Sequence, residues 1–230
     1  WLGSLAVPDT IRPVIWIIAL AVDLVTPWLA VQAVPDRVYD LSHIPERYGL
    51  FTIIVLGEAI IAVARGTSES DWTPAAVTAA VAGFVIAAVI WWAYFAHQEQ
   101  TLLEQGRLPA FVWGYGHVFV WAGIAMMGVG IEFAIAAANT GHAFPPGERL
   151  VLCGGLALYL TAMALLHAAG AGRLGDPVAL ARIATAVVVL LIGVFGGGLA
   201  PETLTVIVAL TGIAAGFGIS RAWGHTFAPA

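Results

Sequence analysis

The chain has 230 residues, of which 60% are hydrophobic and 10% are charged, and its mean hydropathy is +0.93. A soluble domain carries roughly 45–50% apolar and about 25% charged residues, so a soluble fold of this length would leave apolar surface that its few charges cannot cover. The net charge of −5 argues against nucleic acid as a partner, because phosphate binding needs a basic surface. These numbers favour an integral membrane protein with lipid as its solvent.

Seven apolar segments follow one another, each near the roughly 20 residues that a helix needs to span the hydrocarbon layer. We predict spanning helices over residues 11–34, 46–64, 74–97, 110–138, 148–169, 177–199 and 202–223. The connectors are short and rich in polar residues, Gly and Pro, so consecutive helices are expected to be antiparallel neighbours. The predicted fold is therefore all-α, a polytopic transmembrane helix bundle in a single domain over residues 1–230.

The first predicted helix carries an acid, Asp23, near its middle, and Thr26 and Pro27 follow it. An ionised acid at this depth costs at least ~2.5 kcal/mol, so it should be neutral, paired or turned toward a wet cavity. One interpretation is a functional acid. The other is a kink at Pro27, where Thr26 satisfies the backbone group that the proline releases. Both interpretations remain open.

The second predicted helix has the densest polar pattern, with His43, Glu46 and Arg47 around its start and Gly57 and Glu58 near its middle. At about 100° and 1.5 Å per residue, Arg47 and Glu58 lie within roughly 20° of one face and about 16 Å apart along the axis. We predict that polar side chains line one face of this helix, from the charged residues at the membrane surface to an acid at the middle of the membrane. The alternative is an interfacial ion pair worth about 0–1 kcal/mol, with Glu58 as a protonated structural group.

The later helices offer fewer candidates. The fourth carries His117 and Glu132, which could face one side, whereas His167 lies near a helix end and is expected to be an ordinary interfacial residue. The third helix, and largely the fifth to seventh, are predicted to be scaffold. The pairs Gly193 with Gly197 and Gly212 with Gly216 have the spacing of close helix contacts in lipid.

Motifs for metal or covalent chemistry do not occur in the sequence. There is a single cysteine, Cys153, and neither a His-Glu-x-x-His motif nor a Gly-x-Ser-x-Gly elbow is present. We therefore expect a protein that is not an enzyme and that binds no cofactor or metal. A membrane-embedded enzyme acting on lipid is the least favoured hypothesis.

The second helix carries a specific signature. Its sequence reads His-Ile-Pro-Glu-Arg-Tyr-Gly-Leu-Phe over residues 43–51, and Leu-Gly-Glu follows at residues 56–58. This strongly resembles the pattern of the bacterial low temperature requirement protein A family, which is His-x-x-Glu-Arg-aromatic-Gly-Leu-Phe, then aliphatic residues, then Leu-Gly-Glu. The preceding helix also resembles the family's, whereas beyond Gly66 the resemblance is mostly one of helical hydropathy.

The resemblance implies a multi-spanning protein of the bacterial inner membrane. Family members are usually longer, so the chain, which begins at Trp1, is expected to be their C-terminal portion and to adjoin an N-terminal part. The family name records growth at low temperature and supplies no agreed substrate. The motif carries over His43, Glu46, Arg47, Gly57 and Glu58 as functional positions.

Two hypotheses about function remain. In the first, the chain carries protons, cations or a small solute across the membrane, with Asp23 and Glu58 facing one cavity and His43 and Arg47 at its mouth. In the second, it is a non-transport stress or lipid-sensing protein whose acids are structural hydrogen-bonding groups. The expected partners are the lipid bilayer, the transported species and, through helix contacts, further copies of the chain.

Overall fold

The structure is a computed structural model that describes residues 2–33, 43–96, 101–173 and 175–226. The chain forms two compact units, Trp1–Asp40 and Leu41–Ala230, which are described separately. Within the described residues the secondary structure is helical, and seven helices are long and apolar enough to cross a membrane. This confirms the predicted all-α class and the seven spans.

The first unit consists of η1 (Leu2–Ala6) and α1 (Arg12–Ala33). The start of α1 holds η1 through side chains, because Arg12 Nε donates to the Ser4 carbonyl at 3.2 Å and Trp16 Nε1 donates to Ser4 Oγ at 2.8 Å. Further along α1, the Thr26 hydroxyl donates to the Val22 carbonyl at 2.7 Å, one turn before Pro27. Pro27 frees the carbonyl of Asp23, four residues before it, so this bond to Val22 is not the one that the kink interpretation requires, and both interpretations of the segment stay open.

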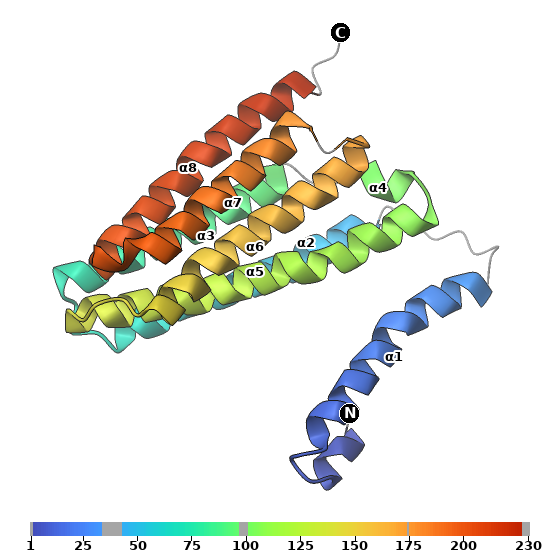
Figure 1. Cartoon of the computed structure of the whole chain (residues 1–230), viewed down its shortest axis with the longest axis horizontal. Coiled ribbons are helices and arrows are strands. Elements are labelled where there is room, and N and C mark those ends of the chain that lie inside the picture. The colour runs from blue at the N-terminus through green and yellow to red at the C-terminus, as the bar shows by residue number, and fades with distance from the viewer. Residues whose placement is uncertain (1, 34–42, 97–100, 174, 227–230) are drawn as a thin grey trace. The chain divides into compact units, whose positions relative to one another are not determined.

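The second unit is a bundle in which the long helices lie lengthwise side by side (Figure 1). Its elements are α2 (His43–Ser68), α3 (Pro74–Ala96), α4 (Thr101–Glu104), α5 (Arg107–Thr140), α6 (Pro146–Ala171), α7 (Pro177–Phe195), η2 (Gly196–Gly198) and α8 (Pro201–Thr226). Two boundaries differ instructively from the prediction. Helix α2 begins at His43 and includes Pro45, which a first turn tolerates because its N–H would have no helical partner there. Helix α7 ends at Phe195, where the run of three glycines tightens into η2.

Helix α5 forms the centre of the bundle and packs against α2, α3, α4, α6 and α8. Its fully buried side chains recur at three- and four-residue steps, which is the spacing of one helix face packed into its neighbours: Val120, Ile124, Met127, Ile131 and Ile135. The contact of α5 with α6 is especially close because glycines face backbone there. A Cβ added to Gly123 would lie 2.6 Å from the Tyr159 nitrogen and 2.7 Å from the Gly155 oxygen.

The glycine pairs found in the sequence are also packing sites. A Cβ on Gly193 would lie 2.7 Å from Cys153 Cβ, and one on Gly216 would lie 2.8 Å from the Trp92 ring. A Cβ on Gly197 would lie 3.2 Å from Arg149 Nη2. These pairs bring α7 against α6 and α8 against α3 within one chain, as small residues do in membrane bundles.

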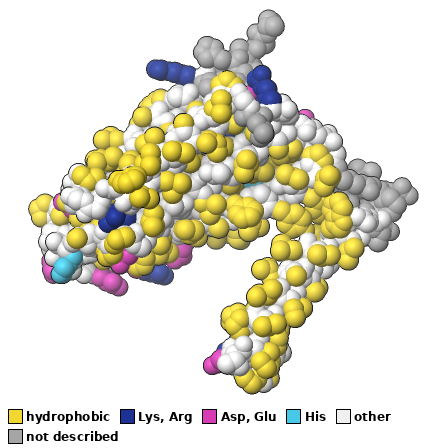
Figure 2. Space-filling view, viewed as in Figure 1, with side chains coloured by type: hydrophobic (Ala, Val, Ile, Leu, Met, Phe, Trp, Pro, Cys, Tyr) yellow, Lys and Arg dark blue, Asp and Glu magenta, His cyan; other side chains and the backbone are white. Residues whose placement is uncertain are grey.

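The surface matches a lipid environment. Figure 2 shows hydrophobic side chains over most of the visible face of the bundle, with charged side chains gathered toward its ends. Exposed Leu, Ile, Val and Phe side chains occur along α2, α5, α7 and α8. In water such a surface would associate, whereas in a bilayer it is the ordinary outer surface of a spanning bundle.

The close α5–α6 contact gives the first prediction. Gly123→Ala places a methyl group against backbone that cannot move aside, so the free energy of unfolding should fall by ~1–3 kcal/mol. The matched control is Gly154→Ala on α6, where a Cβ meets nothing within 4 Å and the better helix former should be neutral or slightly stabilising. Thermal unfolding in detergent micelles measures both; equal stability of the two variants would contradict the packing described.

Candidate functional site

The residues of the sequence signature lie on two opposite faces of α2. His43, Glu46 and Arg47 are exposed at its start, and His43 Nδ1 lies 3.4 Å from Glu46 Oε2. A pair this exposed contributes about 0–1 kcal/mol and would serve an interfacial cap equally well. The structure therefore brings His43 and Glu46 together, and it shows no ion pair of Arg47 among the described residues.

Glu58 has a partner that the sequence reasoning missed. Its Oε1 lies 3.5 Å from Arg65 Nη1, and the two side chains are 55% and 56% exposed. Arg65 follows Glu58 by seven residues, which places it within about 20° of the same helix face and about 10 Å farther along the axis. The long arginine side chain covers this distance by extending back toward Glu58. Arg47 shares this face but lies about 16 Å away in the other direction. The seven-residue spacing was the signal available in the sequence.

The inner face of α2 is anchored in a cluster of aromatic rings. Tyr48 lies 4.7 Å from Trp113 and 5.1 Å from both His117 and Trp121, measured between ring centroids. The Thr52 hydroxyl accepts a hydrogen bond from Trp121 Nε1 at 3.0 Å and donates one to the Tyr48 carbonyl at 2.8 Å. The aromatic position of the signature thus docks α2 onto α5 and leaves the Glu58 side of the helix facing outward.

His117 belongs to this cluster and not to the outer face. It is buried, and its Nδ1 lies 2.8 Å from the Trp113 carbonyl oxygen. A carbonyl can only accept, so Nδ1 carries the hydrogen. Glu132, farther along α5, is half-buried, and the described residues show no hydrogen bond or ion pair of its side chain. Asp23 lies exposed on α1, in the other unit, so the expected shared cavity of Asp23 and Glu58 stays a prediction.

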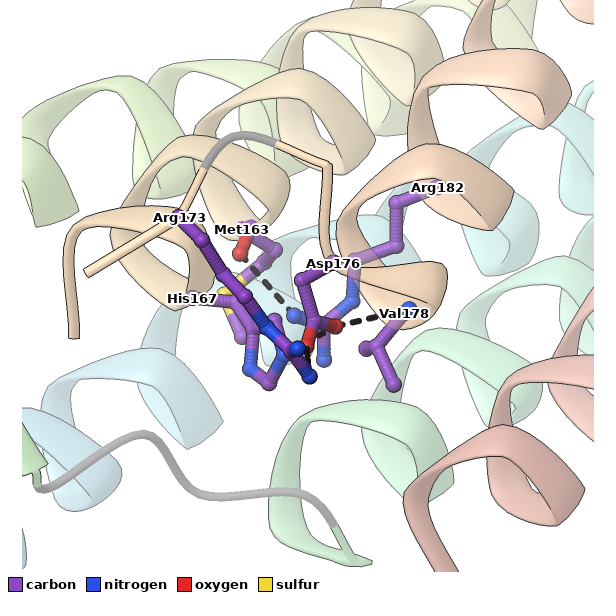
Figure 3. Close-up of polar contacts among 6 residues, drawn as sticks. All are labelled: Met163, His167, Arg173, Asp176, Val178 and Arg182. Carbon is purple, nitrogen blue, oxygen red and sulfur yellow. Dashed lines mark hydrogen bonds and ion pairs between the residues drawn. The ribbon is translucent and has the colours of Figure 1, made fainter. Parts of the chain in front are cut away.

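A second polar cluster, which the sequence reasoning did not find, joins the end of α6 to the start of α7 (Figure 3). His167 Nε2 donates to Asp176 Oδ1 at 2.8 Å, and the two side chains are 2% and 0% exposed. The expectation that His167 is an ordinary interfacial residue is therefore wrong. Asp176 also caps α7 by accepting from the Val178 N–H at 2.8 Å, and Arg173 Nη2 donates to its other oxygen at 3.1 Å.

These partners determine the charge state of Asp176. Burial alone raises the pKa of its carboxyl, but the hydrogen bonds from Val178 and His167, the charge of His167 and the hydrogen bond from Arg173 together outweigh burial. The pKa of Asp176 therefore lies below its ordinary value, and the carboxylate is the form that the cluster holds. Every polar atom of this carboxylate has a protein donor.

Two buried arginines complete the connection of α6 with α7. Near the cluster, Arg182 Nη1 donates to the Met163 carbonyl at 2.9 Å (Figure 3). At the opposite end of the hairpin, Arg149 Nε donates to the Gly193 carbonyl at 3.0 Å and Nη1 to the Phe144 carbonyl at 2.6 Å. Arg149 thus places a positive charge at the C-terminal end of α7, where the helix dipole favours it. The hairpin is pinned at both ends, as expected of scaffold.

Metal chemistry has no support in the described part of the chain, where no group of three or more His, Cys, Asp or Glu side chains is placed to hold a metal ion. The polar groups of the bundle therefore fall into two kinds. The α6–α7 groups other than the exposed Arg173 are buried, and each of them has at least one hydrogen-bond partner. The Glu58–Arg65 pair is half-exposed in the span of α2, and it is the candidate functional site.

Comparison with known proteins gives a family match over most of the chain. The sequence model of the family described as bacterial low temperature requirement A protein (LtrA) matches residues 1–216, well beyond the signature in α2. An uncharacterized protein of Rhizobium meliloti (strain 1021) is 29% identical over 148 residues, which is 58% of this chain and 36% of that protein. The match thus spans about a third of this relative's length. No solved structure matches the chain.

The Asp176 cluster generates the second prediction. Asp176→Asn should lower the free energy of unfolding by about 1–3 kcal/mol at pH 7, because charge-assisted hydrogen bonds are weakened. Since the folded-state pKa is lowered, the stabilisation is complete above the ordinary aspartate pKa of about 3.9 and is lost as the pH falls through the folded value. The gap between wild type and variant should therefore shrink below about pH 4. Thermal unfolding across pH measures it, with the exposed Asp71→Asn as control; a gap independent of pH would contradict this account.

Proposed function

The chain belongs to the bacterial low temperature requirement A family, and on this premise we propose that it carries protons or small cations across a bacterial inner membrane, with Glu58 as the binding group. Family membership and seven apolar helices make it a multi-pass membrane protein. Transport, the inner membrane and a requirement at low temperature are the proposed parts. The proposal is of a protein without enzymatic activity.

The observation that carries this proposal is the Glu58–Arg65 pair inside an apolar span. Helix α2 runs about 22 Å from His43 to Glu58 and about 15 Å from Glu58 to Ser68, at 1.5 Å per residue, so Glu58 lies at hydrocarbon depth if α2 crosses the membrane. Ionisable groups at that depth are costly and typically mark the pathways of ions and protons. The half-exposure of both side chains leaves the carboxylate accessible to a ligand.

The geometry suggests how the site would work. Arg65 neutralises Glu58, so the empty site carries no net charge and is cheaper to hold in the membrane than a lone acid. A proton or cation that binds the carboxylate replaces Arg65 as its counter-charge. When the ion leaves, the pair forms again. A single carboxylate with one partner suits such an exchange, whereas Asp176, with three donors, does not.

A structural role is the alternative, and one observation favours it. The same pairing that neutralises Glu58 would also make it a stable polar contact for a neighbouring helix. The chain would then be a non-transport stress or lipid-sensing protein. A neutral amide at position 58 still forms hydrogen bonds, so Glu58→Gln should preserve function in that case and abolish it in a transporter.

Flux measurements decide between the two. Purified protein in liposomes should carry protons, or sodium or potassium ions, down an imposed gradient, and Glu58→Gln should lower that flux by ~10²-fold or more because the binding group is gone. Glu69→Gln is the matched control, since Glu69 lies just past the end of α2 and is exposed. Full flux in Glu58→Gln, or the absence of any proton or cation flux in wild type, would refute the proposal.

Growth provides a second measurement. A bacterial strain that depends on this protein at low temperature should grow there with wild type or Glu69→Gln and should fail with Glu58→Gln, while all three grow at the ordinary temperature. The reason is that the charge at position 58 is required by the transport step. Equal growth of the Glu58→Gln strain at low temperature would show that growth there does not depend on the charge of Glu58.

A further inference from the structure

Within the second unit, the outer face of α2 is apolar and exposed along its length. Its aliphatic side chains are between 40% and 67% exposed: Leu50, Ile53, Ile54, Ile60 and Ile61. The opposite face is buried through Thr52, Leu56 and Ala59, and α2 packs there against α3 and α5. Exposed aliphatic side chains alone would suit lipid, so they do not by themselves indicate a partner.

The ion pair on this face does indicate one. Glu58 and Arg65 lie among the exposed aliphatic residues, and lipid tails offer a charged pair no hydrogen bonds. A face that presents both to hydrocarbon would be costly, whereas a second polar protein surface would satisfy them. The face therefore fits a protein partner with an acid and a base at matching depth.

Gly57 adds an independent observation. A Cβ added to Gly57 would meet nothing within 4 Å, whereas one on Gly66, on the inner face of the same helix, would lie 3.1 Å from Ile135. Gly66 is thus used for packing inside the bundle, and Gly57 leaves open backbone next to Glu58. Small residues on an outward face allow the backbone of another helix to approach closely in lipid.

We propose that this surface, the α2 outer face, is the contact between two copies of the chain, related by a twofold axis along the membrane normal. A twofold contact joins a patch to itself, so the patch must be self-complementary. This one is, because the Arg65 guanidinium reaches back along α2 to the level of the Glu58 carboxylate, so that one acid and one base lie at that level. In the parallel pair each Glu58 meets the guanidinium of Arg65 from both copies, and Gly57 allows the helices to approach.

Cross-linking in the membrane tests the contact. Ile54→Cys and Ile61→Cys, each made in the full chain, should form disulfide-linked dimers on mild oxidation, because both positions lie close to the proposed axis. Leu190→Cys, exposed on α7, is the matched control and should form no disulfide-linked dimer. The native Cys153 is buried and should not react. The absence of disulfide-linked dimers in both α2 variants would overturn the proposal.

The open glycine supplies a variant that should keep the fold. Gly57→Leu fills space that is empty in the single chain, so thermal stability in detergent should be unchanged while the dimer is lost. Gly154→Leu, at an equally open position on α6, should remain dimeric. Loss of dimers in both variants, or in neither, would contradict a contact through α2.

Charge reversal gives the sharpest result. Glu58→Arg leaves two positive charges on the face and Arg65→Glu leaves two negative ones, so neither variant should form dimers with itself. When they are expressed together with different affinity tags, each should capture the other at least about tenfold more than itself. No preference for the mixed pair would refute the twofold contact. These readouts are independent of flux, so a failed transport assay and a failed dimer assay are distinguishable.

Discussion

A charged side chain in the hydrocarbon layer costs about 2.5–3.5 kcal/mol or more unless protein groups satisfy it, because lipid offers neither hydrogen bonds nor counter-charge. This constraint organises the polar residues of the chain. The charged groups that the bundle encloses have their partners in or directly before the hairpin of α6 and α7: Asp176 takes three donors, and Arg149 and Arg182 donate to backbone carbonyls. The hairpin of α6 and α7 is consequently fixed at both ends.

The apolar core is held together by a different interaction. Between helices in lipid the hydrophobic driving force is weak, so close packing has to supply the attraction. Glycines on α5 and α6 bring the two backbones together, and the buried stripe of α5 fills the space toward α2 and α3. The aromatic cluster around Tyr48 fixes which face of α2 points inward. As a consequence Glu58 and Gly57 face outward, and the orientation of the candidate site follows from packing on the opposite side of the helix.

Hydropathy predicted the seven spans well, because roughly 20 apolar residues between polar connectors leave few alternatives in a bilayer. It could not predict which side chains face inward, since the aliphatic residues of α2 look alike on both faces. His167, Asp176 and Arg182 were missed because hydropathy does not show which polar residues near a helix end are buried, and because Asp176 lies in a short polar connector. Glu58 was found from its motif and depth, but its partner was sought toward Arg47, whereas a long arginine side chain reaches back from Arg65.

The contrast between Asp176 and Glu58 explains why function is placed on α2. A carboxylate that is completely buried with three donors can give up its charge only by weakening all three hydrogen bonds, so its role is structural. A half-exposed carboxylate with one partner at 3.5 Å can exchange that partner while the helix stays in place, because its anchoring contacts lie on the other face. The same openness is the ground for the proposal that a second copy of the chain covers the pair. The two proposals, an exchangeable acid and a contact between two copies of the chain, therefore rest on one feature, a charged pair that the fold of the second unit leaves incompletely enclosed.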